Sequence, residues 1–316
     1  MVTTLSSYIA GLRQHLGELR KNANQKLDLI SLMKISDEEL GKTYLLQKIE
    51  NPHPAFGWSY SNRYMNWRIR NSIIASFSKE KRRPLKCLEV GCFEGNLLFL
   101  LNNLFNSDRD IEFIGGDLSP KGIALAQRRS DFFKLSNRIK FQVMDANKLP
   151  FDDNTFDVLI CSEVLEHLEN PEIAINEFYR VLKPGGLAII TTPNKGLGIL
   201  GIASRILNSV IKSFKAKNSR FNVPICSGQR EKGVGFGHIS EKSSKEWTKI
   251  FKNKFYIQRR SGTGGILFGG PELDRHPLLF SLIVIFETIF GKLPFAYCWA
   301  QTAFFELRKN VNQKLD

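Results

Sequence analysis

Between residues 85 and 192, short apolar runs alternate with longer stretches whose apolar positions recur every three or four residues. The short runs predict buried strands and the longer stretches predict helices. The predicted strands are 85–90, 111–116, 139–144, 156–161 and 187–192, and the predicted helices are 96–104, 121–134 and 171–182. Continuously apolar strands that alternate with helices are typical of a parallel sheet covered on both faces.

The pattern outside this region predicts additions to the same domain. Further on, 240–251 is expected to form a helix, and 255–261 and 303–308 are expected to form strands, which brings the predicted sheet to seven strands. Residues 1–84 predict a helical N-terminal extension that covers a substrate site or mediates dimer contacts. Residues 85–310 predict one Rossmann-like α/β domain with inserts at 195–236 and 262–300.

Charge is the unusual feature of the composition. The chain has 45 Lys and Arg against 31 Asp and Glu, a net charge of +14. Residues 195–232 hold eight basic side chains and one acid, whereas 150–180 is strongly acidic. Within the basic insert, apolar residues at helical spacing over 199–215 predict an amphipathic helix. A basic surface of this kind indicates nucleic acid, an anionic membrane surface or an acidic ligand as a partner.

The cysteines and the apolar runs bear on the cellular location of the protein. The 5 cysteines are scattered without a CxxC pair, so neither a disulfide framework nor a zinc ribbon is indicated. We find no stretch of ~20 apolar residues that would span a membrane and no secretory signal pattern. We therefore expect a cytoplasmic protein, either free or associated with a membrane surface.

Polar residues and glycines follow three of the predicted strands. The first strand leads into Gly91 and Gly95, the second ends in Asp117, and the third ends in Asp145. Ligands of open α/β sheets bind outside the carboxyl ends of the strands, where glycines allow a tight turn and a carboxylate can accept from ribose hydroxyls. Phe93 breaks the G-x-G-x-x-G pattern, which disfavours a nicotinamide-dependent oxidoreductase. Each residue alone also fits a simple turn, a helix cap or a loop aspartate.

Taken together, these motifs resemble the class I S-adenosylmethionine-dependent methyltransferases. The resemblance rests on Glu89-Val-Gly-Cys-Phe-Glu-Gly95, Asp117, Asp145, Glu163-Val-Leu-Glu-His167, Val181-Leu-Lys-Pro-Gly-Gly186 and Thr192-Pro-Asn194. It implies S-adenosyl-L-methionine as cofactor, with Glu89 and Gly91 at its methionine end, Asp117 at its ribose and Asp145 at its adenine amine. The full cofactor-binding set that the resemblance implies is Glu89, Gly91, Cys92, Gly95, Asp117, Leu118, Asp145, Ala146 and Ser162. Phe93 departs from the family, which usually has glycine there.

The segment Glu163-Val-Leu-Glu-His167 raises the question of a metal. We expect it to begin a helix, which would place Glu163, Glu166 and His167 on one face. The E-x-x-E-H string resembles two metal-assisted groups, the ubiquinone-pathway O-methyltransferases and the small-RNA 2′-O-methyltransferases. By that resemblance Glu163, Glu166, His167 and His238 are the candidate ligands of a divalent cation. Metal-free family members carry a similar segment, so Glu163, His167 and His238 are equally candidates for catalytic acid–base work or substrate contact.

The expected acceptor follows from the inserts. The chain has 24 Phe against 7 Tyr, and a basic helix with an apolar face favours a membrane surface or an amphiphilic ligand over nucleic acid. We therefore expect O-methylation of a small-molecule or lipid-linked acceptor, with 199–215 as a lid that rests on anionic lipid. The alternatives are a metal-assisted RNA 2′-O-methyltransferase and a cofactor-binding protein without catalysis.

Overall fold

The computed structural model describes residues 84–105, 111–195, 239–263 and 302–311, together with 69, 72–73, 75–76, 298 and 300. The elements are β1 (Leu85–Val90), α5 (Asn96–Leu104), β2 (Ile111–Asp117), α6 (Pro120–Phe132), β3 (Ile139–Val143), β4 (Phe156–Ser162), η3 (Leu165–His167), α7 (Pro171–Val181), β5 (Leu182–Pro193), α9 (Ser244–Lys252), β6 (Phe255–Thr263) and β7 (Thr302–Lys309). The predicted N-terminal extension, the amphipathic helix 199–215 and the insert 262–300 lie almost wholly outside these residues.

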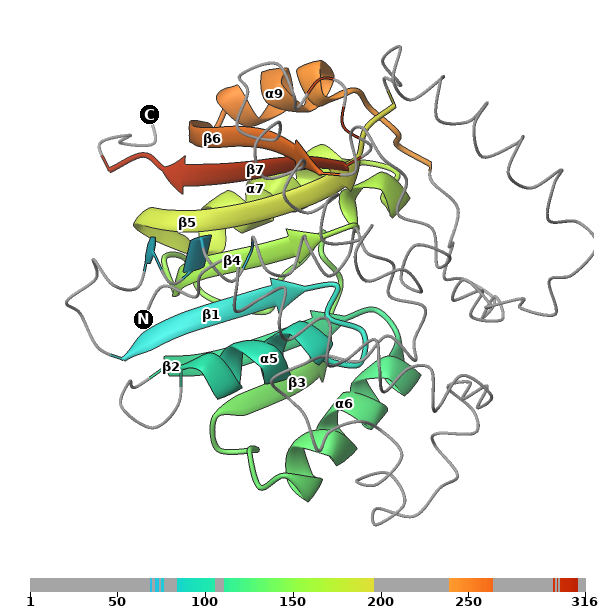
Figure 1. The fold of residues 1–316 in the computed structure, drawn as a ribbon, viewed down its shortest axis with the longest axis vertical. Helices are drawn as coiled ribbons and strands as arrows, with labels where there is room; N and C mark the ends of the chain where they lie inside the picture. Colours follow the sequence, from blue (N-terminus) through green and yellow to red (C-terminus); the bar gives the residue numbers. More distant parts are fainter. Residues whose placement is uncertain are drawn as a thin grey trace, which may run out of the picture.

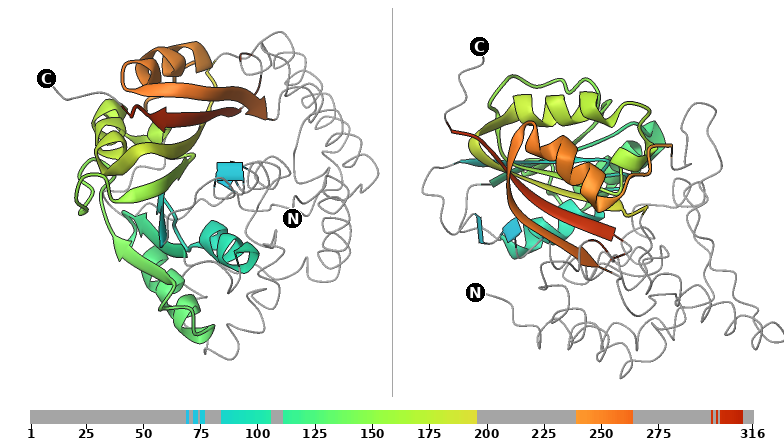
Figure 2. Two further views of the ribbon diagram at one scale, coloured as in Figure 1. Left: turned by 90° about the vertical axis from the view of Figure 1, so that its left-hand side faces the viewer. Right: turned by 90° about the horizontal axis from the view of Figure 1, so that it is seen from above.

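The strands form one seven-stranded sheet in the order β3-β2-β1-β4-β5-β7-β6 (Figure 1). The pairs β1–β2, β2–β3, β1–β4 and β4–β5 are parallel, and β7 runs antiparallel to both of its neighbours. The predicted mostly parallel, Rossmann-like sheet is therefore confirmed. Strand order reverses between β1 and β4, which is where open α/β sheets bind ligands. Figure 2 shows the strong twist of the sheet from the β6 edge to the β3 edge.

Helices cover both faces because alternate residues of each strand point to opposite sides. One core cluster joins Cys87 and Ile189 to α5 and α6, and the other joins Leu88 and Ile190 to α7 and α9. The side chains that the four helices contribute include Leu97, Leu98, Leu101, Ile123, Ala126, Ala174, Phe178, Trp247 and Phe251. Among the described helices, none is long and apolar enough to cross a membrane.

Two elements differ from their predicted form. β5 begins at Leu182, not at residue 187, because Leu182 pairs with Phe156 before the register shifts and pairing resumes at Leu187. The Lys-Pro-Gly-Gly stretch is thus an irregular part of the strand, with Gly185 at φ 78°. α9 begins at Ser244, later than expected, because Ser243 and Glu246 form a capping box there.

Candidate functional site

The turn after β1 requires glycine at two positions. Gly91 and Gly95 have φ values of 79° and 77°, a region that side chains disfavour. The amides of Gly91 and Cys92 both donate to the carbonyl oxygen of Gly116 on β2, at 2.7 and 3.0 Å. A Cβ atom on Gly91 would overlap the side chain of Val164, which follows β4. The turn is therefore packed against the ends of two strands.

Phe93 occupies this turn without disturbing it. Its φ of 45° is the left-handed conformation that glycine adopts readily. Its ring packs against α6, where a Cβ atom on Gly122 would lie 2.8 Å from Cδ2 of Phe93. The absence of a side chain at Gly122 thus makes room for the ring, and the departure from the family pattern does not prevent the turn from forming.

Asp117 ties the end of β2 to the glycine turn. Its Oδ2 accepts from the amide of Phe93 and its Oδ1 from the amide of Ser119, both at 2.8 Å. Burial raises the pKa of Asp117, and the amide hydrogen bonds oppose that rise. The alternative role of helix cap falls to Ser119, whose Oγ accepts from the amide of Gly122 at 3.2 Å. The Asp117 carboxylate therefore binds the amides of the loops at Phe93 and Ser119, and it does not cap α6.

Glu89 is a buried carboxyl group at the end of β1. It is 6% exposed, and among the described residues its Oε2 has no hydrogen-bond partner. Burial, followed by the nearby charge of Asp117, raises the pKa of Glu89 to about 8. A buried acceptor without a partner is costly. A cationic donor brought to this position would lower that cost.

Asp145 and Ala146 follow β3 beside the end of β2. The amide of Met144 donates to the carbonyl oxygen of Asp117 at 3.0 Å, which joins the two strand ends. Asp145 is exposed, and its Oδ1 accepts from the amide of Asn147 at 2.8 Å. Ala146 is buried, whereas Leu118 is 52% exposed. The predicted residues of β1, β2 and β3 are thus linked through main-chain contacts at one edge of the sheet.

A second group of polar residues lies at the ends of β4 and β5. Ser162 Oγ and Thr191 Oγ1 are 2.9 Å apart, and Thr191 Oγ1 donates to Glu163 Oε1 at 3.1 Å. Glu163 has a φ of 56°, a strained conformation for a side-chain-bearing residue. The expectation that Glu163 begins a helix is wrong: η3 is a single 3₁₀ turn over Leu165–His167, and the helix α7 begins at Pro171.

Glu166 is buried beneath this turn, and that position changes the metal prediction. It is 1% exposed, and burial, followed by the charge of Glu163, raises its pKa to about 8. Its Oε1 is 3.8 Å from Nε2 of His167. Within the described ranges, no group of three or more His, Cys, Asp or Glu side chains could hold a metal ion. Glu163, Glu166 and His167 therefore do not form the shared helix face on which the metal prediction rests, and His238 lies outside the described residues.

Asn194, just after β5, is a buried residue whose role its sequence position did not reveal. Its Oδ1 accepts from the amide of Ser244 at 2.9 Å, and its Nδ2 donates to the carbonyl oxygens of Cys298 and Ala300 at 3.2 and 3.0 Å. Nearby, the amides of Ile239 and Ser240 both donate to the carbonyl oxygen of Glu166. The chain thus returns at 239 and at 298 to the same edge of the sheet as the strand ends.

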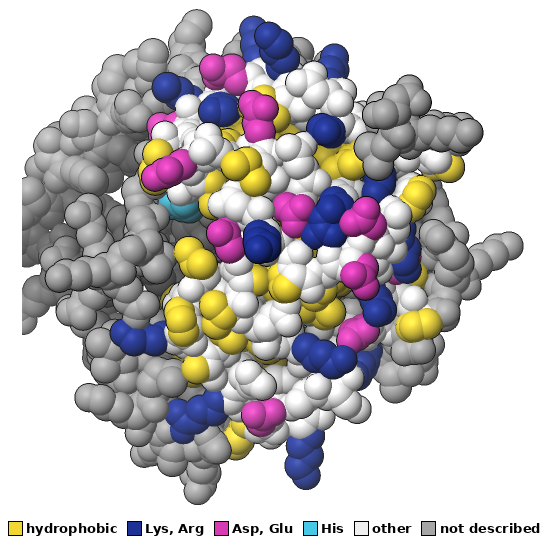
Figure 3. All heavy atoms as spheres, turned by 180° about the vertical axis from the view of Figure 1, so that it is seen from behind, with side chains coloured by type: hydrophobic (Ala, Val, Ile, Leu, Met, Phe, Trp, Pro, Cys, Tyr) yellow, Lys and Arg dark blue, Asp and Glu magenta, His cyan; other side chains and the backbone are white. Residues whose placement is uncertain are grey.

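The acidic stretch 150–180 is partly neutralised by ion pairs. Asp153 and Glu177 pair with Arg180 at 2.9 and 2.8 Å, and Asp157 pairs with Lys183 at 2.8 Å. On the face shown in Figure 3, basic and acidic side chains are accordingly intermixed, with apolar side chains between them. Most of the basic insert 195–232 lies outside the described residues.

The part of the chain that contains these strand ends is similar to known proteins. Residues 88–190 match a family described as methyltransferase domain. The chain is 36% identical over 133 residues to the mitochondrial ubiquinone biosynthesis O-methyltransferase of Rattus norvegicus, an alignment that covers 40% of this chain and 37% of that protein. It is 35% identical over 106 residues to phosphoethanolamine N-methyltransferase 3 of Arabidopsis thaliana, which covers 34% of this chain and 20% of that protein. The chain thus spans well under half the length of these two relatives.

A third relative and a solved structure extend the comparison. The demethylmenaquinone methyltransferase of Thermus thermophilus is 29% identical over 143 residues, which is 45% of this chain and 61% of that protein. The crystal structure of the [4+2]-cyclase SpnF matches with a TM-score of 0.50 and 19% identity, and it covers 78% of this chain and 81% of that one. This structural match concerns the fold alone.

Proposed function

We propose that this chain is a class I S-adenosylmethionine-dependent methyltransferase that transfers the methyl group of that cofactor to an oxygen atom of a small-molecule or lipid-linked acceptor. Its residues 88–190 match a family described as methyltransferase domain. The observation that supports the proposal is the linked edge of β1, β2 and β3: the Asp117 carboxylate accepts from the glycine turn, and the Asp117 carbonyl oxygen accepts from the amide of Met144, next to Asp145. The named relatives include O- and N-methyltransferases. The choice of oxygen follows the ubiquinone-pathway relative and the E-x-x-E-H segment.

The residues present fit the cofactor at its methionine end. The Oε2 of Glu89, which has no hydrogen-bond partner within the described part of the chain, offers a buried acceptor to the cofactor's ammonium group. Gly95, the N-cap residue of α5, has no side chain to cap the helix, so the backbone N–H groups of the first turn suit a carboxylate. The tight turn at Gly91 would let the main chain approach the ligand closely, and Cys92, whose side chain is buried in the core, would contribute its backbone beside that turn.

The remaining candidates fit the nucleoside. Both carboxylate oxygens of Asp117 accept from loop amides, and a carboxylate offers about four lone-pair sites, so Asp117 would still accept from a ribose hydroxyl. Asp145 would accept from the adenine amino group, with Leu118 and Ala146 supplying apolar contacts to the ring. Ser162, at the end of β4, would lie beside the part of the cofactor that carries the methyl group.

The cofactor would supply a methyl group bound to a sulfonium, which is a good leaving group. The protein's main task is then to hold the acceptor oxygen in line with the bond between sulfur and the methyl carbon. The acceptor oxygen forms the new C–O bond as the C–S bond breaks, and its proton must leave. Glu163 and His167, at the ends of β4 and η3, are the candidates to take that proton. The Ser162–Thr191–Glu163 hydrogen bonds hold the Glu163 carboxylate in place.

The proposed acceptor class can be tested directly. Full-length protein would be incubated with methyl-labelled S-adenosylmethionine and a panel that contains a catechol, a prenylated hydroquinone, phosphoethanolamine and short RNA. Label on a hydroxyl of the catechol or hydroquinone supports the proposal. Label on phosphoethanolamine alone would mean that the methyl acceptor is a nitrogen atom. Label on RNA alone would mean that the substrate is nucleic acid.

Membrane association belongs to the same proposal. It rests on the basic, apolar composition of 199–215, and co-sedimentation with vesicles tests it. Pelleting with vesicles that contain phosphatidylserine, and not with pure phosphatidylcholine vesicles, supports contact with an anionic surface. Equal pelleting with both, or pelleting with neither, rejects it.

A further inference from the structure

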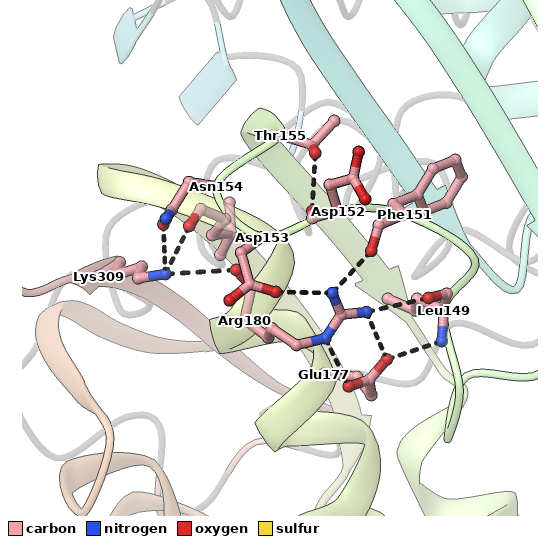
Figure 4. Close-up of polar contacts among 10 residues, drawn as sticks. Leu149, Phe151, Asp152, Asp153, Asn154, Thr155, Glu177, Arg180 and Lys309 are labelled. Atoms are coloured by element: carbon pink, nitrogen blue, oxygen red, sulfur yellow. Dashed lines mark hydrogen bonds and ion pairs between the residues drawn. The ribbon is translucent and has the colours of Figure 1, made fainter. Parts of the chain in front are cut away.

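Arg180 makes hydrogen bonds to three residues of the loop between β3 and β4. This loop begins at the proposed adenine contacts, Asp145 and Ala146, and returns to β4 at Phe156. Arg180 lies in the last turn of α7 and reaches the loop from beneath (Figure 4). The cluster does not include any residue placed in the cofactor site above.

All five N–H groups of the Arg180 guanidinium have partners. Nη1 donates to the carbonyl oxygen of Phe151 at 2.6 Å and to Asp153 Oδ1 at 2.9 Å. Nη2 donates to the carbonyl oxygen of Leu149 at 3.0 Å and to Glu177 Oε2 at 2.8 Å. Nε donates to Glu177 Oε1 at 2.8 Å. A guanidinium has five donors in a fixed plane, so this arrangement leaves no donor to spare.

Glu177 completes the grip on Leu149. Its Oε2 accepts from the amide of Leu149 at 2.8 Å, so both polar groups of that residue's main chain are held by the Arg180–Glu177 pair. The Leu149 side chain is buried as well. Leu149 is therefore fixed in position by packing and by two charge-assisted hydrogen bonds.

The pair is itself fixed to the sheet. Lys309, the last residue of β7, donates to Asn154 Oδ1 and to the carbonyl oxygen of Leu182 at 2.8 Å each. It also donates to the carbonyl oxygen of Arg180 at 3.3 Å. The end of α7 and the residues just before β4 are thus attached to the same strand.

The segment from Asp145 to Leu149 is short and closed. Asp145 and Lys148 form an isolated β-bridge, and the amide of Lys148 donates to the carbonyl oxygen of Asp145 at 3.0 Å. Because Leu149 directly follows this bridge, a displacement of Leu149 is transmitted to the Asp145 carboxylate. Asp145 is exposed, and among the described residues no ion pair is seen to hold its carboxylate.

We propose that Arg180 is a positioning residue for the cofactor's adenine: through Leu149 it sets where the Asp145 carboxylate meets the exocyclic amino group. The inference rests on the proposed function, since it takes Asp145 as the adenine contact. A purely structural Arg180 would affect stability and leave the discrimination between purine bases unchanged. The two possibilities therefore differ in a measurable property.

The test compares two ligands whose bases differ at position 6. S-inosylhomocysteine carries a carbonyl oxygen there and a proton on N1, whereas S-adenosylhomocysteine carries the amino group. The part of their affinity ratio that Asp145→Ala removes therefore reports the Asp145 contact. A hydrogen bond to a charged group corresponds to about a 10- to 100-fold preference for the adenine ligand in the unaltered protein. Arg180→Lys keeps the charge and loses the planar fork, and we expect it to reduce that preference at least about fivefold.

Two further variants serve as control and support. Asp153→Asn removes the ion pair between Arg180 and the Asp153 side chain, which is 63% exposed. Among the described residues no hydrogen bond or ion pair joins Asp153 to 145–149, so this variant should leave the ratio unchanged. Glu177→Gln weakens the hold on the Leu149 amide and should lower the ratio in the same direction as Arg180→Lys. If circular dichroism shows that Arg180→Lys does not fold, the affinity ratio of Glu177→Gln tests the proposal instead.

The outcomes separate this inference from the function on which it rests. A ratio unchanged in folded Arg180→Lys and in Glu177→Gln, with only stability reduced, overturns the positioning role. A ratio unchanged in Asp145→Ala overturns the adenine assignment, and the inference falls with it. If Asp145→Ala removes the preference and Arg180→Lys reduces it, the double variant should show no more loss than Asp145→Ala alone, because both changes then act on one contact.

Discussion

Replacement of Glu89 by glutamine should make the ligand-free protein less sensitive to pH while weakening cofactor binding. The Glu89 carboxyl has a pKa near 8 in the folded protein against 4.5 ordinarily, chiefly because of burial. Between those two values the folded state keeps a proton that the unfolded state has released. The unfolded state therefore binds fewer protons, and the free energy of unfolding falls as pH rises through this window.

The magnitude follows from the difference between the two pKa values. One pKa unit is worth about 1.4 kcal/mol, so at pH 7 the raised pKa of Glu89 costs the ligand-free protein up to about 3 kcal/mol. Urea unfolding at pH 5, 6, 7 and 8 measures the effect. The unfolding free energy of the unaltered protein should fall relative to that of Glu89→Gln by about 1 kcal/mol per pH unit. Glu166, whose pKa is also about 8, contributes equally to both proteins and cancels in the comparison.

The same carboxyl should ionise when the cofactor's ammonium group arrives. Binding of S-adenosylhomocysteine near pH 7 should then release a proton, which calorimetry detects as a heat that differs between phosphate and Tris buffers. Glu89→Gln should bind more weakly and lose this buffer dependence. Parallel pH profiles of stability for the two proteins, together with buffer-independent heats for the unaltered protein, would refute the reasoning.

Four other changes follow from the site. Gly91→Val should lower affinity for S-adenosylhomocysteine at least about 100-fold, because the new side chain meets Val164 at a φ of 79°; calorimetry showing full affinity would disprove the close approach. Asp117→Ala should weaken that binding by roughly 1.5–3 kcal/mol and also lower the melting temperature, because the carboxylate holds two loop amides; unchanged affinity would remove the ribose assignment. Phe93→Gly should keep affinity within about threefold while it lowers stability, since the ring packs on Gly122; a loss in calorimetry larger than tenfold would place the ring against the ligand. Methyl transfer should continue in EDTA, because the described acids and His167 form no metal cluster; a loss that Mg²⁺, Mn²⁺ or Zn²⁺ restores would instead support a site completed by His238.

The sheet could be predicted from the sequence because its strands are buried on both faces. Such strands are largely apolar, and the run 85–90 is bounded by Pro84 and Gly91. The glycine turn and the aspartates were found for a related reason. Parallel strands place their carboxyl ends at one edge, so residues far apart in sequence can be assigned to one site.

The features that could not be predicted from the sequence depend on main-chain conformation and on contacts between residues far apart in the chain. Helical spacing of Glu163, Glu166 and His167 predicted a shared face, but the left-handed conformation of Glu163 and the single turn of η3 break that geometry. The sequence does not reveal the role of Arg180, because its partners include the carbonyl oxygens of Leu149 and Phe151, which are 31 and 29 residues away. Asn194 was hidden for the same reason, since it bonds to Ser244, Cys298 and Ala300.

A titration of full-length protein with S-adenosylhomocysteine, run beside NADH and beside the Asp117→Ala variant, tests the central claim most directly. The account predicts saturable one-to-one binding of S-adenosylhomocysteine, no binding of NADH, and at least about tenfold weaker binding by the variant. Absence of binding at millimolar ligand, or equal affinity in the variant, would contradict the assignment of this edge of the sheet to the cofactor.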